Sequence, residues 1–164
     1  MGRVALILLV ALALLAAEAP RESPRPVEIR AERLEADYGE GLLQFFGRVT
    51  VRRGDFLMES REMKVHLRSE NGTNRLEWAE ALGDVRISYG NKRATCRRAV
   101  YYADEEKVIL EGDPVLWEGD NRLRGARIVV FLKEDRAIVE GAPGRRVELV
   151  VTEEGGEGKF LPRP

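Results

Sequence analysis

The chain has little of what enzymes and metalloproteins usually need. Its 164 residues contain one cysteine and one histidine. A single cysteine excludes an internal disulfide, so stability must come from packing and strand pairing. A single histidine leaves a cupin-type metal site, which uses several histidines inside a jelly roll, without ligands. We therefore expect no metal, no cofactor and no enzyme activity.

A charge excess of one sign and a nucleotide-binding loop are also missing. The 27 Lys and Arg residues nearly balance the 28 Asp and Glu residues, and the two signs are interspersed along the chain. This distribution is not typical of a nucleic-acid-binding protein. Because no Gly-x-x-x-x-Gly-Lys-Ser/Thr segment is present, any energy that the function requires would come from another protein.

Long apolar runs are confined to the N-terminus, where a basic start precedes 14 uncharged residues, 4–17, and small residues follow. This pattern is typical of a secretory signal peptide and predicts export, with cleavage after Ala17. The alternative is an uncleaved anchor, although 14 residues span only about 21 Å of a roughly 30 Å hydrocarbon core. The predicted organisation is a signal peptide at 1–17, a flexible entry segment at 18–26, one domain at 27–152 and a flexible tail at 153–164.

Glycines recur at a fixed spacing in the predicted domain. Gly83, Gly112 and Gly141 are each 29 residues apart, and Gly47 lies 36 residues before Gly83. The seven extra residues fall in the polar stretch 69–75. A short period of this kind is typical of stacked supersecondary units, none of which can bury its apolar face alone.

Between these glycines, apolar and polar residues alternate with a period of two, as in Val49 and Val51 against Arg48 and Thr50. Strict alternation favours half-buried strands. Turn signals separate the segments at 54–55, 71–72, 90–91, 104–106 and 119–121. No helical pattern of adequate length follows the signal peptide. The sequence therefore predicts an all-β domain, either a sandwich, a jelly roll or a rolled β-solenoid. Its unpaired edges are expected at 27–37 and 147–152.

Isolated polar residues do not converge on a reaction. His66 alternates with apolar neighbours and is interpreted as a surface residue. Cys96 aligns with other small residues of the repeat, so we favour structural packing over a nucleophile. Asp55, Asn91 and Asp120 follow turn glycines, and turn chemistry explains them better than calcium binding.

The apolar face is rich in valine, methionine and alanine, with a few aromatic residues among them. Flexible methionines and small β-branched residues around aromatic rings suit a channel that adapts to varied acyl chains. A plain hydrophobic core is the alternative. The inward candidates include Phe45, Val49, Val51, Met58, Met63, Val65, Trp78, Val85, Ala94, Tyr101, Val108, Trp117 and Val130.

Several segments, in this order and spacing, resemble the LptA/OstA-like family of lipopolysaccharide-transport proteins. The opening match is Ala-Glu-Arg-Leu-Glu-Ala-Asp at 31–37, followed by Phe-Gly-Arg-Val-Thr-Val at 46–51. The further matching segments are 54–55, 63–65, 81–85, 110–116 and 125–128. The resemblance covers roughly 27–151.

The resemblance implies a semi-open antiparallel β-jelly roll in the periplasm of a Gram-negative bacterium. Such a protein would hold the acyl chains of lipid A in its apolar interior. It would join head to tail through its terminal strands, and join LptC-like inner-membrane and LptD-like outer-membrane components, to form a bridge between the membranes. On this basis the expected lipid-binding residues are Val49, Val51, Met63, Val65, Val85, Ile87, Tyr101, Leu110, Ile128 and Val130.

Two other interpretations stay open. An LptC-like component would share the fold but keep its N-terminal segment in the inner membrane. A β-solenoid scaffold would polymerise without cargo and bury every apolar side chain.

Overall fold

The structure is a computed structural model that describes residues 26–134 and 136–152. The predicted signal peptide and tail therefore lie outside the described residues. The described chain is all-β, as predicted, and forms one 12-stranded antiparallel sheet. Its strands are β1 (Glu28–Arg30), β2 (Arg33–Asp37), β3 (Leu42–Arg53), β4 (Phe56–Glu70), β5 (Thr73–Tyr89), β6 (Lys92–Tyr102), β7 (Lys107–Glu111), β8 (Val115–Glu118), β9 (Asn121–Arg124), β10 (Arg127–Phe131), β11 (Arg136–Glu140) and β12 (Glu148–Val150).

The sheet consists of two leaves joined along a line of corners. The pairing register shifts within β3, β4 and β5 at 46–49, 59–62 and 82–85, so each long strand contributes to both leaves. Leaf 1 contains β2, β7, β10, β11 and the segments 42–46, 62–70, 73–82 and 98–102. Leaf 2 contains β1, β8, β9, β12 and the segments 49–53, 56–60, 85–89 and 92–96.

The repeated glycines form the corners. The sequence pattern indicates one strand before each glycine and another after it, but in β3 and β5 the two are halves of one bent strand. Two consecutive residues in the left-handed region turn the chain into the other leaf without ending the pairing. The φ angles at three corners are Gly47 78°, Arg48 44°, Gly83 78°, Asp84 49°, Gly112 74° and Asp113 58°.

The last corner differs from the others. Between β11 and β12 the chain makes a small loop over 141–147, closed by two backbone hydrogen bonds between Ala142 and Arg145. Gly144 takes the positive φ there, at 74°. The fourth repeat therefore keeps its glycine spacing but replaces the bend by a loop.

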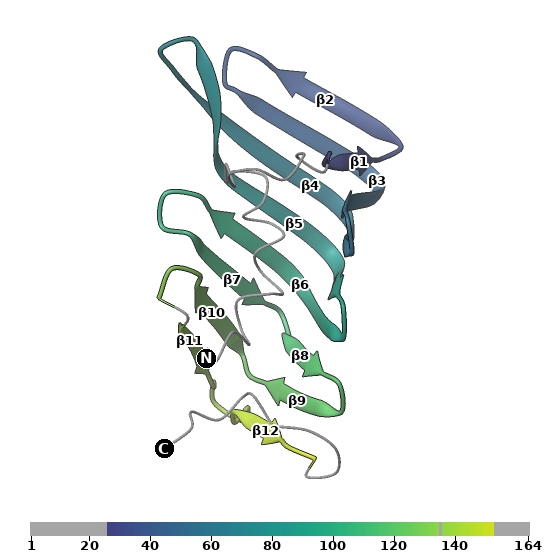
Figure 1. Cartoon of the computed structure of the whole chain (residues 1–164), viewed down its shortest axis with the longest axis vertical. Helices are drawn as coiled ribbons and strands as arrows, with labels where there is room; N and C mark the ends of the chain where they lie inside the picture. The colour runs from purple at the N-terminus through teal and green to yellow at the C-terminus, as the bar shows by residue number, and fades with distance from the viewer. Residues whose placement is uncertain (1–25, 135, 153–164) are drawn as a thin grey trace.

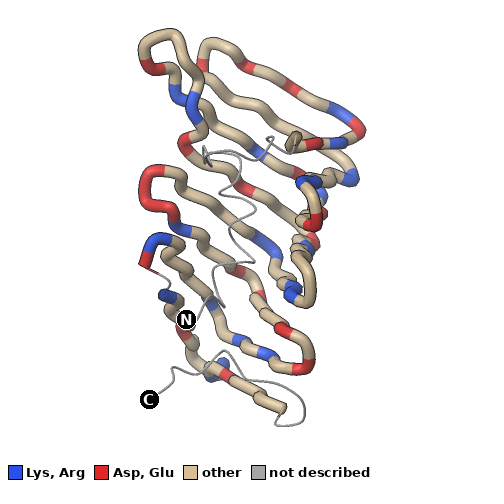
Figure 2. Tube along the Cα trace, viewed as in Figure 1, with Lys and Arg blue, Asp and Glu red and all other residues tan. Residues whose placement is uncertain are grey.

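The repeats follow one another along the long axis of the molecule (Figure 1). β1 and β2 lie at one end, and β11 and β12 at the other. Basic and acidic residues are scattered over the whole stack, as predicted, and neither sign gathers in a block (Figure 2). Within the described ranges, no helical segment could cross a bilayer.

Candidate functional site

The inner faces of the two leaves form one apolar cluster. All ten predicted lipid-binding residues belong to it, six from leaf 1 and four from leaf 2, and none is more than 7% exposed. The leaf 1 members are Met63, Val65, Tyr101, Leu110, Ile128 and Val130, and the leaf 2 members are Val49, Val51, Val85 and Ile87. Period-two alternation explains this placement, since successive residues of a strand face opposite sides.

Two rows of directly paired residues cross the whole stack without a polar side chain. The row in leaf 1 is Leu34, Phe45, Met63, Ala81, Ala99, Leu110, Ile128 and Val139. The row in leaf 2 is Ile29, Val51, Met58, Ile87, Ala94, Leu116, Leu123 and Leu149. The apolar interior is therefore continuous from one end of the molecule to the other.

An ion pair that the sequence analysis missed lies on the inner face near the hairpin end of leaf 2. Lys92 Nζ lies 3.2 Å from Glu118 Oε1, and both side chains are nearly buried. Glu118 Oε2 has no hydrogen-bond partner among the described residues. Alternation from buried Ala94 to Lys92 is the signal that could have placed this lysine on the inner face.

Cys96 and Tyr101 are buried in the cluster, and neither is activated. Burial raises the pKa of the Cys96 thiol to about 12. Burial, with the nearby Glu106 carboxylate, raises the pKa of the Tyr101 phenol to about 12. A thiol with a raised pKa is a poor nucleophile near neutral pH. The packing interpretation of Cys96 therefore fits the structure better than the catalytic one.

His66 lies on the outer face and is partly exposed. Its Nδ1 is 2.6 Å from Glu77 Oε2, and its ring stacks on Trp78 with 5.4 Å between the centroids. Trp78 and Trp117 face outward, so the inward placement predicted for them is wrong. Trp78 precedes the inward Ala79, and Trp117 lies one residue beyond the inward Leu116 in the same strand, so alternation turns both indoles outward.

The outer face of leaf 1 carries a ladder of alternating charges across its last strands. Arg98 contacts Glu111 at 2.6 Å, Glu111 contacts Arg127 at 3.2 Å, and Arg127 contacts Glu140 at 3.1 Å. A hydrogen bond to Glu80, and then one to Glu111, raises the pKa of the Arg98 guanidinium. The ladder ends at Glu140, on the edge strand β11.

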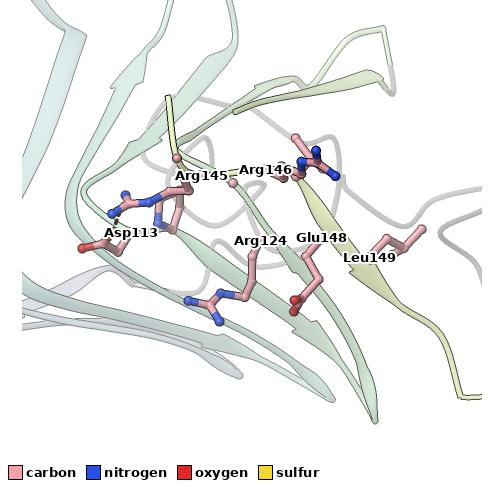
Figure 3. Close-up of a pocket in the computed structure, with 10 residues that line it drawn as sticks. Asp113, Arg124, Arg145, Arg146, Glu148 and Leu149 are labelled. Atoms are coloured by element: carbon pink, nitrogen blue, oxygen red, sulfur yellow. Dashed lines mark ion pairs between the residues drawn. The ribbon is translucent and has the colours of Figure 1, made fainter. Parts of the chain in front are cut away.

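An open hollow of about 680 Å³ lies at the last corner and is partly lined by arginines (Figure 3). Arg145 points toward Asp113 and forms an ion pair with it (Figure 3). Arg124 and Arg146 also line the hollow. None of the ten predicted lipid-binding residues lines it. We assign this hollow to the corner loop and not to the apolar interior.

The two ends of the stack expose strand edges and apolar side chains. Each of β1, β2, β11 and β12 pairs with only one other described strand. The predicted edges 27–37 and 147–152 include three of these strands, and β11 is an edge that the sequence analysis missed. Among the described residues, the large exposed apolar side chains lie at these ends: Leu34, Tyr38, Ile138, Val147, Leu149, Val150 and Val151.

Comparisons with known proteins agree with this architecture. A search of curated proteins found no match. Among solved structures, the chain is similar to LptH, described as the LptA homologous periplasmic component of the conserved lipopolysaccharide transport device from Pseudomonas aeruginosa. The TM-score is 0.65 at 18% identity, over 78% of this chain and 96% of that one. Residues 28–136 match the family described as LptA/(LptD N-terminal domain) LPS transport protein. The chain therefore belongs to the LptA/LptD N-terminal domain family.

Proposed function

We propose that this protein is a periplasmic carrier of lipopolysaccharide that holds the acyl chains of lipid A between its two leaves. The observation that carries the proposal is the pair of apolar rows that cross the molecule from end to end. A core that served only stability would not need to continue into exposed Leu34 and Leu149 at the two end strands. The family membership supports the choice of lipid.

The energetics favour an apolar path for such a lipid. Each methylene removed from water contributes about 0.8 kcal/mol, so a lipid with several acyl chains cannot cross an aqueous space unaided. The backbone pairing of the sheet is open at its ends, and it links the two leaves only through the strands that bend at the corners. Acyl chains can therefore enter from the hairpin side while the charged sugars stay in water.

The ten proposed contact residues are buried in the structure, so lipid can reach them only after the two leaves move apart. Lipid has to take the place of the atoms that now cover Val51 or Val130, so the leaves separate when lipid enters. The exchange replaces apolar contacts between the leaves by apolar contacts with lipid, which offsets part of the cost of separating the leaves. The buried Lys92–Glu118 pair lies near the opening side, where a lipid phosphate could compete for the lysine.

We further propose that copies of this chain join head to tail. An unpaired edge strand offers its backbone groups to another chain, and strand addition is a common way to join β proteins. In the same way the end strands would receive LptC-like and LptD-like components. Leu34 is 53% exposed, so covering the rest of its side chain would contribute about 1 kcal/mol to a junction.

Photocrosslinking tests the carrier proposal. A photoreactive residue at Val51 should crosslink to lipopolysaccharide in cells, and Val130 should do the same. Arg52 is the matched control, because it is the next residue of β3 and is exposed on the outer face. Equal crosslinking from Val51 and Arg52, or none from Val51 and Val130, would contradict the proposal and favour a scaffold without cargo.

An LptC-like component of the same pathway, with a similar fold, is the alternative. The N-terminal segment decides between them, because a retained segment would anchor the protein in the inner membrane. Mass spectrometry of the exported protein is expected to find an N-terminus after Ala17. An intact N-terminus on a membrane-bound protein would favour the LptC-like assignment.

A further inference from the structure

The two ends of the molecule are complementary in a single register, and we propose that the next copy docks in that register. The inference rests on the proposed head-to-tail assembly and adds the residue pairs of the junction. In this arrangement β2 of one copy continues leaf 1 beyond β11 of its neighbour, and β1 continues leaf 2 beyond β12.

Strand direction permits this continuation in both leaves. The order in leaf 1 is β2, β3, β4, β5, β6, β7, β10, β11, and in leaf 2 it is β1, β3, β4, β5, β6, β8, β9, β12. Neighbours are antiparallel throughout. Each described leaf therefore has an even number of strands, and its first and last strands run in opposite directions. A second copy stacked in the same orientation meets the end of each leaf with an antiparallel strand.

The charged row of leaf 1 defines the register. Within the chain, Arg127 lies between Glu111 and Glu140, which precede two of the repeated glycines. Arg33 occupies the equivalent position of the first strand, opposite Phe46, which precedes Gly47. If the row continues, Arg33 of the next copy lies opposite Glu140 and extends the ladder of alternating charges.

The other positions of leaf 1 agree with this pairing. Following the paired rows from β2 to β11 places Arg136 opposite Asp37 of the next copy, and Val139 opposite its Leu34. The outer face thus gains two pairs of opposite charge, and the inner face continues its apolar row. Ala137 meets Ala36, and only Ile138, opposite Glu35, lacks a matching partner.

The paired rows of leaf 2 support the same docking register. Its rows place Glu148 opposite Arg30 of the next copy, and Leu149 opposite its Ile29. The remaining position, Val150 opposite Glu28, is not matched.

Corner spacing allows both leaves to dock at once. Two residues separate β9 from β10, and two also separate β1 from β2. β9 and β10 pair with one side of β12 and β11, on either side of the loop 141–147. β1 and β2 of the next copy have the same corner length as β9 and β10, so they fit the free side of β12 and β11.

Slipped registers are less favourable. A slip of two residues in one direction places Glu140 opposite Glu35, which are like charges. The opposite slip places Val139 opposite Glu32, in the corner. A slip of one residue turns every side chain to the wrong face.

Disulfide trapping tests the register. In a Cys96→Ser background, Leu34→Cys combined with Val139→Cys should give a ladder of covalent oligomers on mild oxidation, because directly opposite residues have Cβ atoms about 4.5–5.5 Å apart. Leu34→Cys with Ala137→Cys is the matched control, since this pair is offset by two residues and should crosslink about tenfold less. A stronger ladder from the control pair would overturn the register.

Charge reversal provides a second readout. Glu140→Arg alone should weaken association about tenfold, and Arg33→Glu in the same chain should restore it. Light scattering of the unmodified chain separates the two proposals. A monomer at every concentration would contradict head-to-tail assembly itself, whereas oligomers without rescue by the double reversal would overturn only the register.

Discussion

The middle of the stack and its two ends are built from the same repeat but differ in what covers the apolar face. Leu34 and Met63 share one row of leaf 1 and face the same side. Met63 has paired strands on both sides and is 1% exposed, whereas Leu34 has one and is 53% exposed. The difference shows that in this fold a neighbouring strand, more than residue type, decides whether a side chain is core or interface.

A charge introduced in the middle should have the largest effect. Val85→Asp places a carboxylate in the apolar interior and should lower the free energy of unfolding by about 3 kcal/mol or more. It should also abolish crosslinking to lipopolysaccharide while the ends still dock. Denaturant unfolding and photocrosslinking measure the two effects. Arg86→Asp, on the exposed face next to it, should change neither, and loss of docking in Val85→Asp would indicate misfolding instead of a lipid defect.

Truncating the same row in the middle and at the end separates core from interface. Met63→Ala should lower the free energy of unfolding by about 2–5 kcal/mol, because it leaves a cavity. Leu34→Ala should cost less than about 0.5 kcal/mol in dilute protein but should weaken association. Urea unfolding at low concentration and light scattering at high concentration measure these effects. Equal destabilisation by both variants would show that Leu34 is covered within one copy.

Two corner glycines have the same backbone φ angle but differ in how closely other atoms surround them. Gly112 and Gly144 both have φ of +74°, so alanine is strained at either position. A Cβ at Gly144 meets nothing within 4 Å, whereas a Cβ at Gly112 would lie 2.5 Å from Arg97 Cβ. Gly144→Ala should cost about 1–2 kcal/mol and Gly112→Ala about 1 kcal/mol more. Thermal unfolding measures the loss of stability in both variants. Equal losses would mean that Arg97 moves away from the added Cβ without a cost in free energy.

The smallest expected effect concerns alkaline pH. Burial raises the pKa of the Cys96 thiol from 9.0 to about 12, so the unfolded chain loses this proton first as pH rises. This contribution to the free energy of unfolding is fully present below pH 9 and is lost as pH rises from 9 to 12, with a loss of about 1.4 kcal/mol by pH 10. Denaturant unfolding at pH 8 to 10 measures it. Cys96→Ser should remove this part of the pH dependence and leave the part due to Tyr101. An unchanged slope in Cys96→Ser would show that the thiol is accessible in the folded state.

Much of the fold could be predicted because its determinants are local. Alternation placed Val49, Val85 and Ile128 on the inner face, and Gly-Asp or Asn-Gly pairs marked the hairpin turns. The inward prediction for Trp78 was wrong, since alternation from buried Ala79 turns the indole to the outer face. Lys92 was missed because a lysine is rarely buried, and its partner Glu118 lies 26 residues away in the chain. Pairs of this kind depend on which strands become neighbours.

The amino-acid sequence by itself determined the all-β class, the repeat and the faces of most strands, because these follow from a period of two and from where glycine permits a left-handed bend. Only the tertiary structure decided that the strands before and after Gly47 and Gly83 are continuous, that β11 is an edge, and that each leaf begins and ends with strands of opposite direction. These features depend on pairing between distant segments, where strand order and corner length act together. Alternation within a single strand carries no information about either.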